Sequence, residues 1–124
     1  MSHITKVKTH LKDGLILRKA LKKLGYEIEE YDLRQSMKAK VEEFMARKGR
    51  EWIGFGRPRK SEDAYEMQAD WEAMKTNRQE VINEIYQTYS QEKIMDLARM
   101  KGYSLMKNKV NEKGQLEIVL RKVG

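Results

Sequence analysis

The 124-residue sequence contains no cysteine, one proline and two histidines. Without cysteine there is no disulfide framework, no thiolate metal site and no cysteine nucleophile. No apolar run approaches the roughly 20 residues that a membrane-spanning helix needs, and residues 1–10 form a polar alternating stretch unlike a signal peptide. We therefore expect one domain over residues 1–124, located in the cytoplasm and not bound to a membrane.

Charge is what the sequence has in excess, at 36% of the residues and a formal net charge of +7. The charge comes in blocks, which are basic over residues 1–26, 34–60 and 101–124 and acidic over residues 27–33 and 61–100. If these blocks segregate in space, they predict a basic face that attracts anionic partners and a separate acidic face. The alternative is that the charged side chains only solvate the outside.

The first part of the chain predicts a strand, a helix and a second short strand. Residues 3–11 are rich in β-branched side chains, which favour a strand. Asp13 is suited to be the N-cap of a helix over residues 13–24, and Gly25 is suited to end it. The helix has an apolar stripe at i, i+3, i+4 and i+7, made of Leu17, Ala20, Leu21 and Leu24.

Residues 34–50 fit two structures. Met37, Val41 and Phe44 recur at i, i+4 and i+7, which favours a helix that Gly49 would end. A strand around residues 39–44 is the alternative. We take the helix as the expectation and keep the strand open.

Two hairpins and a long helix are predicted for the rest of the chain. Residues 51–56 and 64–71 alternate like paired strands, joined by a loop with a basic tip and the single proline. A helix follows from a capping box at Thr76 to about Gly102, with a bend expected near residues 90–93. Two closing strands, at residues 103–110 and 115–122, flank a turn in which Gly114 suits a left-handed backbone.

Hairpin connections dominate this predicted order of elements. Antiparallel strands joined by hairpins commonly have one face covered by helices. We therefore expect an α+β fold, in which an antiparallel sheet built largely from hairpins has two or three helices packed on one face.

Short motifs spread along most of the chain form a set, which comprises Ser2-His3-Ile4-Thr5, Leu24-Gly25-Tyr26-Glu27, Ile53-Gly54-Phe55-Gly56-Arg57, Ala69-Asp70-Trp71, Gly102-Tyr103-Ser104 and Leu116-Glu117-Ile118. This set resembles the hypothetical chloroplast reading frame thirty-five family, small uncharacterised proteins that also have bacterial members. The resemblance does not extend to about residues 32–50, which are richer in Lys and Met. It implies a stand-alone domain of unknown function, in the cytoplasm or the plastid stroma, and assigns no catalytic residue.

The most distinctive surface feature is the basic tip of the first hairpin. Guanidinium groups bind phosphate in a bidentate manner, and exposed aromatic rings can stack on bases. Trp52 and Phe55 precede the tip, although their size and position favour the core. Contact with an anionic partner or nucleic acid is predicted for the tip and the basic helix face, which together contain Arg57, Arg59, Lys60, Arg18, Lys19, Lys22 and Lys23.

No catalytic, cofactor-binding or metal-ligating residue can be assigned from the sequence. His3 and His10 point to opposite faces of the predicted strand and cannot share a metal ion. Adjacent carboxylates point apart, so they do not form an acid–base pair. The Gly54-Phe55-Gly56 motif lacks the spacing of a phosphate-binding loop, and no cofactor is expected.

Three hypotheses of function follow. The leading one is a non-catalytic interaction module that binds a macromolecular partner through its segregated charged surfaces. We expect this partner to be a protein, and a homo-oligomer is an alternative. The first alternative is a nucleic-acid-binding protein that uses the basic hairpin loop and the basic helix face. The second is a small enzyme whose site contains His3, Asp70 and Glu66, which a deep pocket around these residues would favour.

Overall fold

The computed structural model describes residues 4–31, 41–57, 63–110 and 112–122. In chain order the elements are β1 (Ile4–Lys8), α1 (Gly14–Lys23), β2 (Glu27–Glu30), β3 (Val41–Lys48), β4 (Glu51–Arg57), β5 (Glu66–Asp70), α2 (Arg78–Met100), β6 (Tyr103–Val110) and β7 (Leu116–Lys122).

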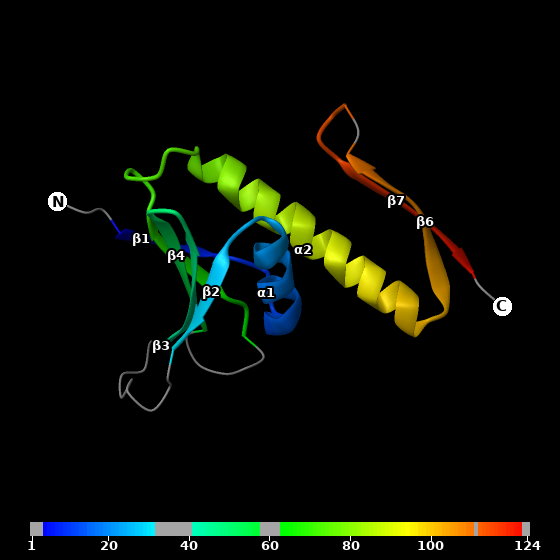
Figure 1. Cartoon of the computed structure of the whole chain (residues 1–124), viewed down its shortest axis with the longest axis horizontal. Coiled ribbons are helices and arrows are strands. Elements are labelled where there is room, and N and C mark those ends of the chain that lie inside the picture. Colours follow the sequence, from blue (N-terminus) through cyan, green and yellow to red (C-terminus); the bar gives the residue numbers. More distant parts are fainter. Residues whose placement is uncertain (1–3, 32–40, 58–62, 111, 123–124) are drawn as a thin grey trace.

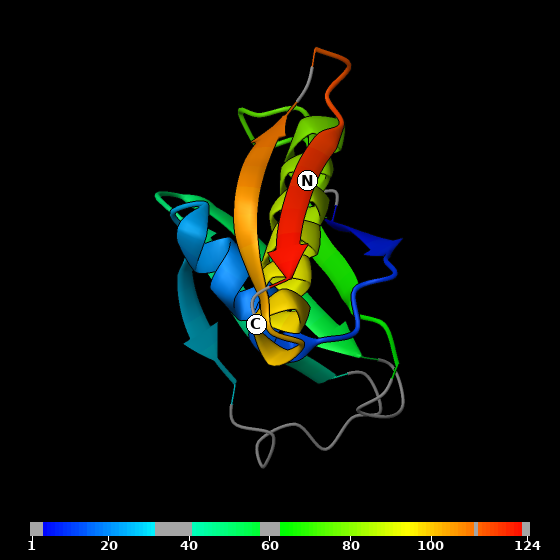
Figure 2. The ribbon, with the colours of Figure 1, turned by 90° about the vertical axis from the view of Figure 1, so that its right-hand side faces the viewer.

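Two layers make up the body of the molecule. The first is an antiparallel sheet with the strand order β1-β5-β4-β3-β2, and the second is formed by α1 and α2, which both lie on one face of that sheet (Figure 1). Strands β6 and β7 form a second sheet of their own, which runs along α2 (Figure 2). The predicted α+β class is confirmed, but the closing hairpin is not part of the main sheet.

Local sequence signals explain α1 well. Asp13 is the N-cap, as predicted, and its carboxylate accepts a hydrogen bond from the backbone N–H of Ile16 at 3.1 Å. The predicted apolar stripe faces the sheet, and Gly25 follows the helix with a φ of +94°. The chain then crosses to the far edge of the sheet, so that α1 joins the two edge strands β1 and β2.

The helix expected over residues 34–50 is wrong for the part that the structure describes. Residues from Val41 onward form strand β3, which pairs with β2 on one side and β4 on the other. Phe44 and Ala46, two residues apart, point to the same face of the strand and are fully buried. Gly49, with a φ of +63°, lies in the turn between β3 and β4 instead of ending a helix. Residues 34–40 lie outside the described residues.

The predicted hairpin of residues 51–56 and 64–71 is confirmed as the antiparallel pair β4–β5, with Phe55 opposite Met67. The tip residues Arg59 and Lys60 lie outside the part of the chain that the structure describes.

Helix α2 is confirmed with a different N-cap, and the bend expected near residues 90–93 stays a prediction. Its N-cap is Asn77, not Thr76, and the Asn77 side chain accepts a hydrogen bond from the backbone N–H of Gln79 at 2.8 Å. The helix continues through residues 90–93, where the apolar stripe is interrupted. The interruption has a physical reason, since Glu92 is only 2% exposed and forms an ion pair with Lys23 of α1.

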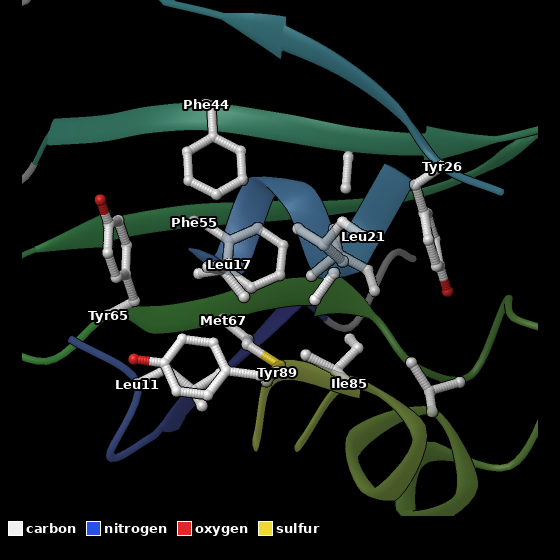
Figure 3. Close-up of a cluster of buried hydrophobic side chains, with 14 of the residues drawn as sticks. Leu11, Leu17, Leu21, Tyr26, Phe44, Phe55, Tyr65, Met67, Ile85 and Tyr89 are labelled. Carbon is white, nitrogen blue, oxygen red and sulfur yellow. The ribbon is translucent and has the colours of Figure 1, made fainter. Parts of the chain in front are cut away.

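The core lies between the helices and the sheet. Phe44, Phe55 and Met67 project from the sheet toward Leu17 and Leu21 of α1 (Figure 3). Ile85 and Tyr89 of α2 close the same cluster. The closing hairpin has the predicted turn, with a φ of +76° at Gly114, but Ile118 and Leu120 on its apolar face are only half-buried.

Candidate functional site

A network of paired charges lies at the end of the sheet where β4 stops and α1 starts. Arg57 at the end of β4 donates to both carboxylate oxygens of Glu43 at 2.8 Å, from Nε and Nη2. Glu43 is the extra residue of a β-bulge in β3, because Glu42 pairs with Gly56 and Phe44 already pairs with Phe55. Bulges re-aim side chains, and this one directs the carboxylate toward the core side of the sheet.

The second pair of the network joins α1 to the edge strand β2. Arg18 donates from Nε and Nη2 to the two carboxylate oxygens of Glu30, each at 2.8 Å, and from Nη1 to the carbonyl of Gly14 at 3.0 Å. These contacts raise the pKa of Arg18, chiefly through the hydrogen bonds with Glu30. The hydrogen bonds with Glu43 raise the pKa of Arg57 in the same way. Both arginines therefore carry a fixed positive charge in a fixed orientation.

Each of the two guanidinium groups lies over the face of an aromatic ring. Arg18 lies 4.3 Å from the centroid of the Phe44 ring, and Arg57 lies 4.5 Å from that of Tyr65. The Tyr65 hydroxyl, at one end of the core in Figure 3, donates to Glu43 at 2.8 Å. Burial raises the pKa of Tyr65, and the hydrogen bond with Glu43 raises it further.

Gly14 allows the first turn of α1 to approach this network. A Cβ at this position would overlap the Tyr65 hydroxyl oxygen and would lie 2.8 Å from Nη1 of Arg18. Above the network is an open depression of about 500 Å³, which we call the α1 depression. It is lined by Lys12, Asp13, Gly14, Leu15, Arg18, Arg57, Tyr65 and Lys93.

The fold brings together two of the seven residues predicted to contact an anionic partner. Arg18 and Arg57 both line the α1 depression, but each is already paired with a carboxylate. Lys19 and Lys22 are exposed on α1, whereas Lys23 pairs with the buried Glu92. The remaining two, Arg59 and Lys60, lie outside the described residues, and contact with nucleic acid stays a prediction.

Sequence analysis missed the lysines beside the two arginines. Lys12 is exposed at the entrance to α1, and Lys93 comes from the middle of α2 with its ammonium 3.5 Å from Asp13. No local signal marks these lysines, because 80 residues separate Lys93 from Asp13.

The aromatic residues proposed to stack on bases are not available at this site. Phe55 is fully buried and stacks on Phe44 with the ring centroids 4.9 Å apart, as expected of a core residue. Trp52 is half-buried and lines a separate cavity of about 230 Å³ with Asp70 and Met74.

The residues of the enzyme hypothesis do not converge in the described part of the chain. His3 lies outside it. Asp70 lines the cavity next to Trp52, whereas Glu66 lies at the other end of β5 and does not line that cavity. Among the residues that the structure describes, no three histidine or carboxylate side chains gather in one place.

Opposite charge blocks meet in the folded chain. Arg18 of the first basic block pairs with Glu30 of the acidic block that follows it, and Arg47 approaches Glu29 in the same way. Lys23 pairs with the distant Glu92. Part of the charge pattern of the sequence is therefore neutralised by ion pairs between these blocks.

One surface keeps both its apolar side chains and its cations exposed. At the end of α2, Leu97 is 44% and Met100 is 77% exposed, and Tyr103 at the start of β6 is also exposed. Tyr103 pairs with Lys122 in the hairpin, so the ends of α2, β6 and β7 meet here (Figure 1). We call this the α2–hairpin surface; it consists of Leu97, Met100 and Tyr103 with the exposed cations Arg99, Lys101, Arg121 and Lys122.

The architecture defines an α+β domain with an appended hairpin. The chain belongs to the family described as Protein of unknown function (DUF1257), whose family model matches residues 20–119. No curated protein and no solved structure matches the sequence. No helix in the described ranges is both long and apolar enough to cross a membrane. The finer resemblance to the hypothetical chloroplast reading frame thirty-five family stays a prediction.

Proposed function

We propose that this protein is a non-catalytic interaction module that docks a partner protein on the α2–hairpin surface. The observation that carries the proposal is the exposure of Leu97, Met100 and Tyr103 on the part of the molecule farthest from the main sheet. Contiguous exposed apolar side chains rimmed by polar groups are typical of protein-binding sites.

The charges of this surface indicate the chemistry of the partner. Arg99, Lys101, Arg121 and Lys122 are exposed around the apolar side chains, and none forms an ion pair among the described residues. Cations on a rim select a partner with acidic groups and accelerate its association. The partner is therefore a protein segment with an apolar centre and acidic flanks.

Two double variants test the surface directly. Leu97→Gln with Met100→Gln removes its apolar centre, and Arg121→Glu with Lys122→Glu reverses its rim charge. Leu15→Gln is a matched apolar control, since Leu15 is 80% exposed on α1, and Lys6→Glu with Lys8→Glu is the control for charge. All of these side chains are exposed or half-exposed, so the variants should fold.

The measurement is affinity capture from an extract of the producing cells with nuclease present, followed by titration of the captured protein with each purified variant. We expect one partner to be retained by wild type and both controls, and to bind each surface variant about tenfold or more weakly. Equal retention by surface variants and controls would contradict the proposal. Loss of every partner on nuclease treatment would also contradict it. So would binding of this surface to anionic lipid vesicles instead of a protein, or a homodimer formed through this surface.

A further inference from the structure

The α1 depression has features of a second binding site, formed by residues other than those of the α2–hairpin surface. Its two arginines are neutralised by Glu30 and Glu43, which accept from them in a bidentate manner. The charge that remains comes from the lysines, because Lys12 makes no ion pair among the described residues. Lys93 pairs with Asp13 at 3.5 Å, longer than the 2.7–2.9 Å of a strong charge-assisted hydrogen bond.

The floor of the depression is rigid. Each guanidinium is held both by a carboxylate and by the face of an aromatic ring, and Tyr65 is fully buried beneath Arg57. A ligand that binds here therefore orders only the two lysine side chains, so little conformational entropy is lost.

The size and lining of the depression limit the class of ligand. Its volume of about 500 Å³ lies in the range of small-molecule sites, and its lining has four cations and one carboxylate, that of Asp13. A nucleobase would find no ring to stack on, since Arg57 covers Tyr65 and Arg18 covers Phe44. We propose that the α1 depression binds a phosphate-bearing small molecule, with Lys12 and Lys93 contacting the phosphate above the paired guanidinium groups.

Inorganic pyrophosphate is the probe for this site, with binding measured by NMR and by calorimetry at about 50 mM salt, where surface charges are weakly screened. In wild-type protein we expect shifts at the backbone amides of Gly14, Arg57 and Lys93. Lys12→Ala with Lys93→Ala should weaken binding about tenfold, because two exposed charge pairs are lost. Lys6→Ala with Lys109→Ala removes the same charge from exposed sites on β1 and β6 and should change the affinity less than about twofold.

Three results would overturn the inference. The first is the absence of shifts at these amides. The second is an equal loss of affinity in both double variants, which would indicate only a response to net charge. The third is binding of a single-stranded oligonucleotide, weakened by Lys12→Ala with Lys93→Ala, without binding of pyrophosphate; this would replace the small ligand by nucleic acid.

Discussion

Replacement of Gly14 by alanine should destabilise the protein, although alanine is the better helix former by about 1 kcal/mol. The new Cβ would overlap the Tyr65 hydroxyl and would lie 3.3 Å from the ring carbon Cζ of Tyr65. Arg18, which the Cβ would also meet, is partly exposed and can move aside only by giving up its contacts with Gly14 and Glu30. The Tyr65 ring cannot withdraw in the same way, since it packs between Arg57 and Phe44.

The change in unfolding free energy is the sum of two losses and one gain. Forcing one extra methyl group into a packed site costs about 1–3 kcal/mol. Displacement of Tyr65 also weakens, without removing, its 2.8 Å hydrogen bond to Glu43, which contributes about 1.5–3 kcal/mol because the acceptor is charged. The gain in helix propensity offsets at most about 1 kcal/mol of this. The net loss of unfolding free energy is therefore about 2 kcal/mol.

A double-mutant cycle with Tyr65→Phe, measured by urea denaturation, tests the cause as well as the size. Tyr65→Phe alone should cost about 2 kcal/mol, because it removes the hydrogen bond to the Glu43 carboxylate. In the double variant the oxygen that the methyl group meets is gone, so the combined loss should fall short of the sum by about 1 kcal/mol. Additive losses, or a Gly14→Ala variant as stable as wild type, would refute the reasoning.

Three further changes have expected outcomes of their own. Asn77→Ala should cost about 1 kcal/mol in urea denaturation, because it removes the N-cap of α2, whereas Thr76→Ala should cost much less. Lys23→Ala should destabilise the protein by about 1–3 kcal/mol more than Lys22→Ala, because it leaves a buried carboxylate of α2 without its cation. The raised pKa of Tyr65 means that folding favours its neutral form, so this stabilisation is complete below about pH 10 and is lost as the pH rises through the folded-state value. Alkaline unfolding, followed together with tyrosine ionisation in the near ultraviolet, should therefore be less steep in Tyr65→Phe.

Elements with local signals were predictable from the sequence. Helix α1 has its cap, its apolar stripe and its terminating glycine within thirteen consecutive residues, 13–25. The closing hairpin was predictable for the same reason, since Gly114 and the flanking alternation are close in sequence. Such signals do not depend on the rest of the fold.

Strand β3 shows where local pattern fails. The spacing of Val41 and Phe44 fits a helix, and nothing within residues 41–48 excludes it. The strand is decided by pairing with β2 and β4, which supplies hydrogen bonds on both edges and buries Phe44 and Ala46 against α1. Tertiary contacts override a local preference in such cases.

The number of charged side chains was predictable from the sequence, but which of them are paired in the fold was not. Arg57 was identified correctly as part of a basic region, yet its partner Glu43 is 14 residues away and is brought into place by a bulge. Sequence alone does not reveal which cations are neutralised. Under the proposal for the α1 depression, Lys12 and Lys93, which sequence analysis did not single out, matter more for anion binding than the arginines that it did.

The distribution of the core sets the end of α2 and the closing hairpin apart from the rest of the chain. The fully buried cluster draws all its described members from residues 11–89, so the end of α2 and the hairpin contribute none of them. A two-stranded hairpin alone is marginally stable in water, and here its main packing partner among the described elements is α2. Apolar side chains such as Leu97 and Met100 therefore gain little by folding in the isolated protein. Under the proposed function, these side chains lose their contact with water when the partner docks, and the burial stabilises the complex. A partner that binds only the folded hairpin also stabilises the hairpin by mass action.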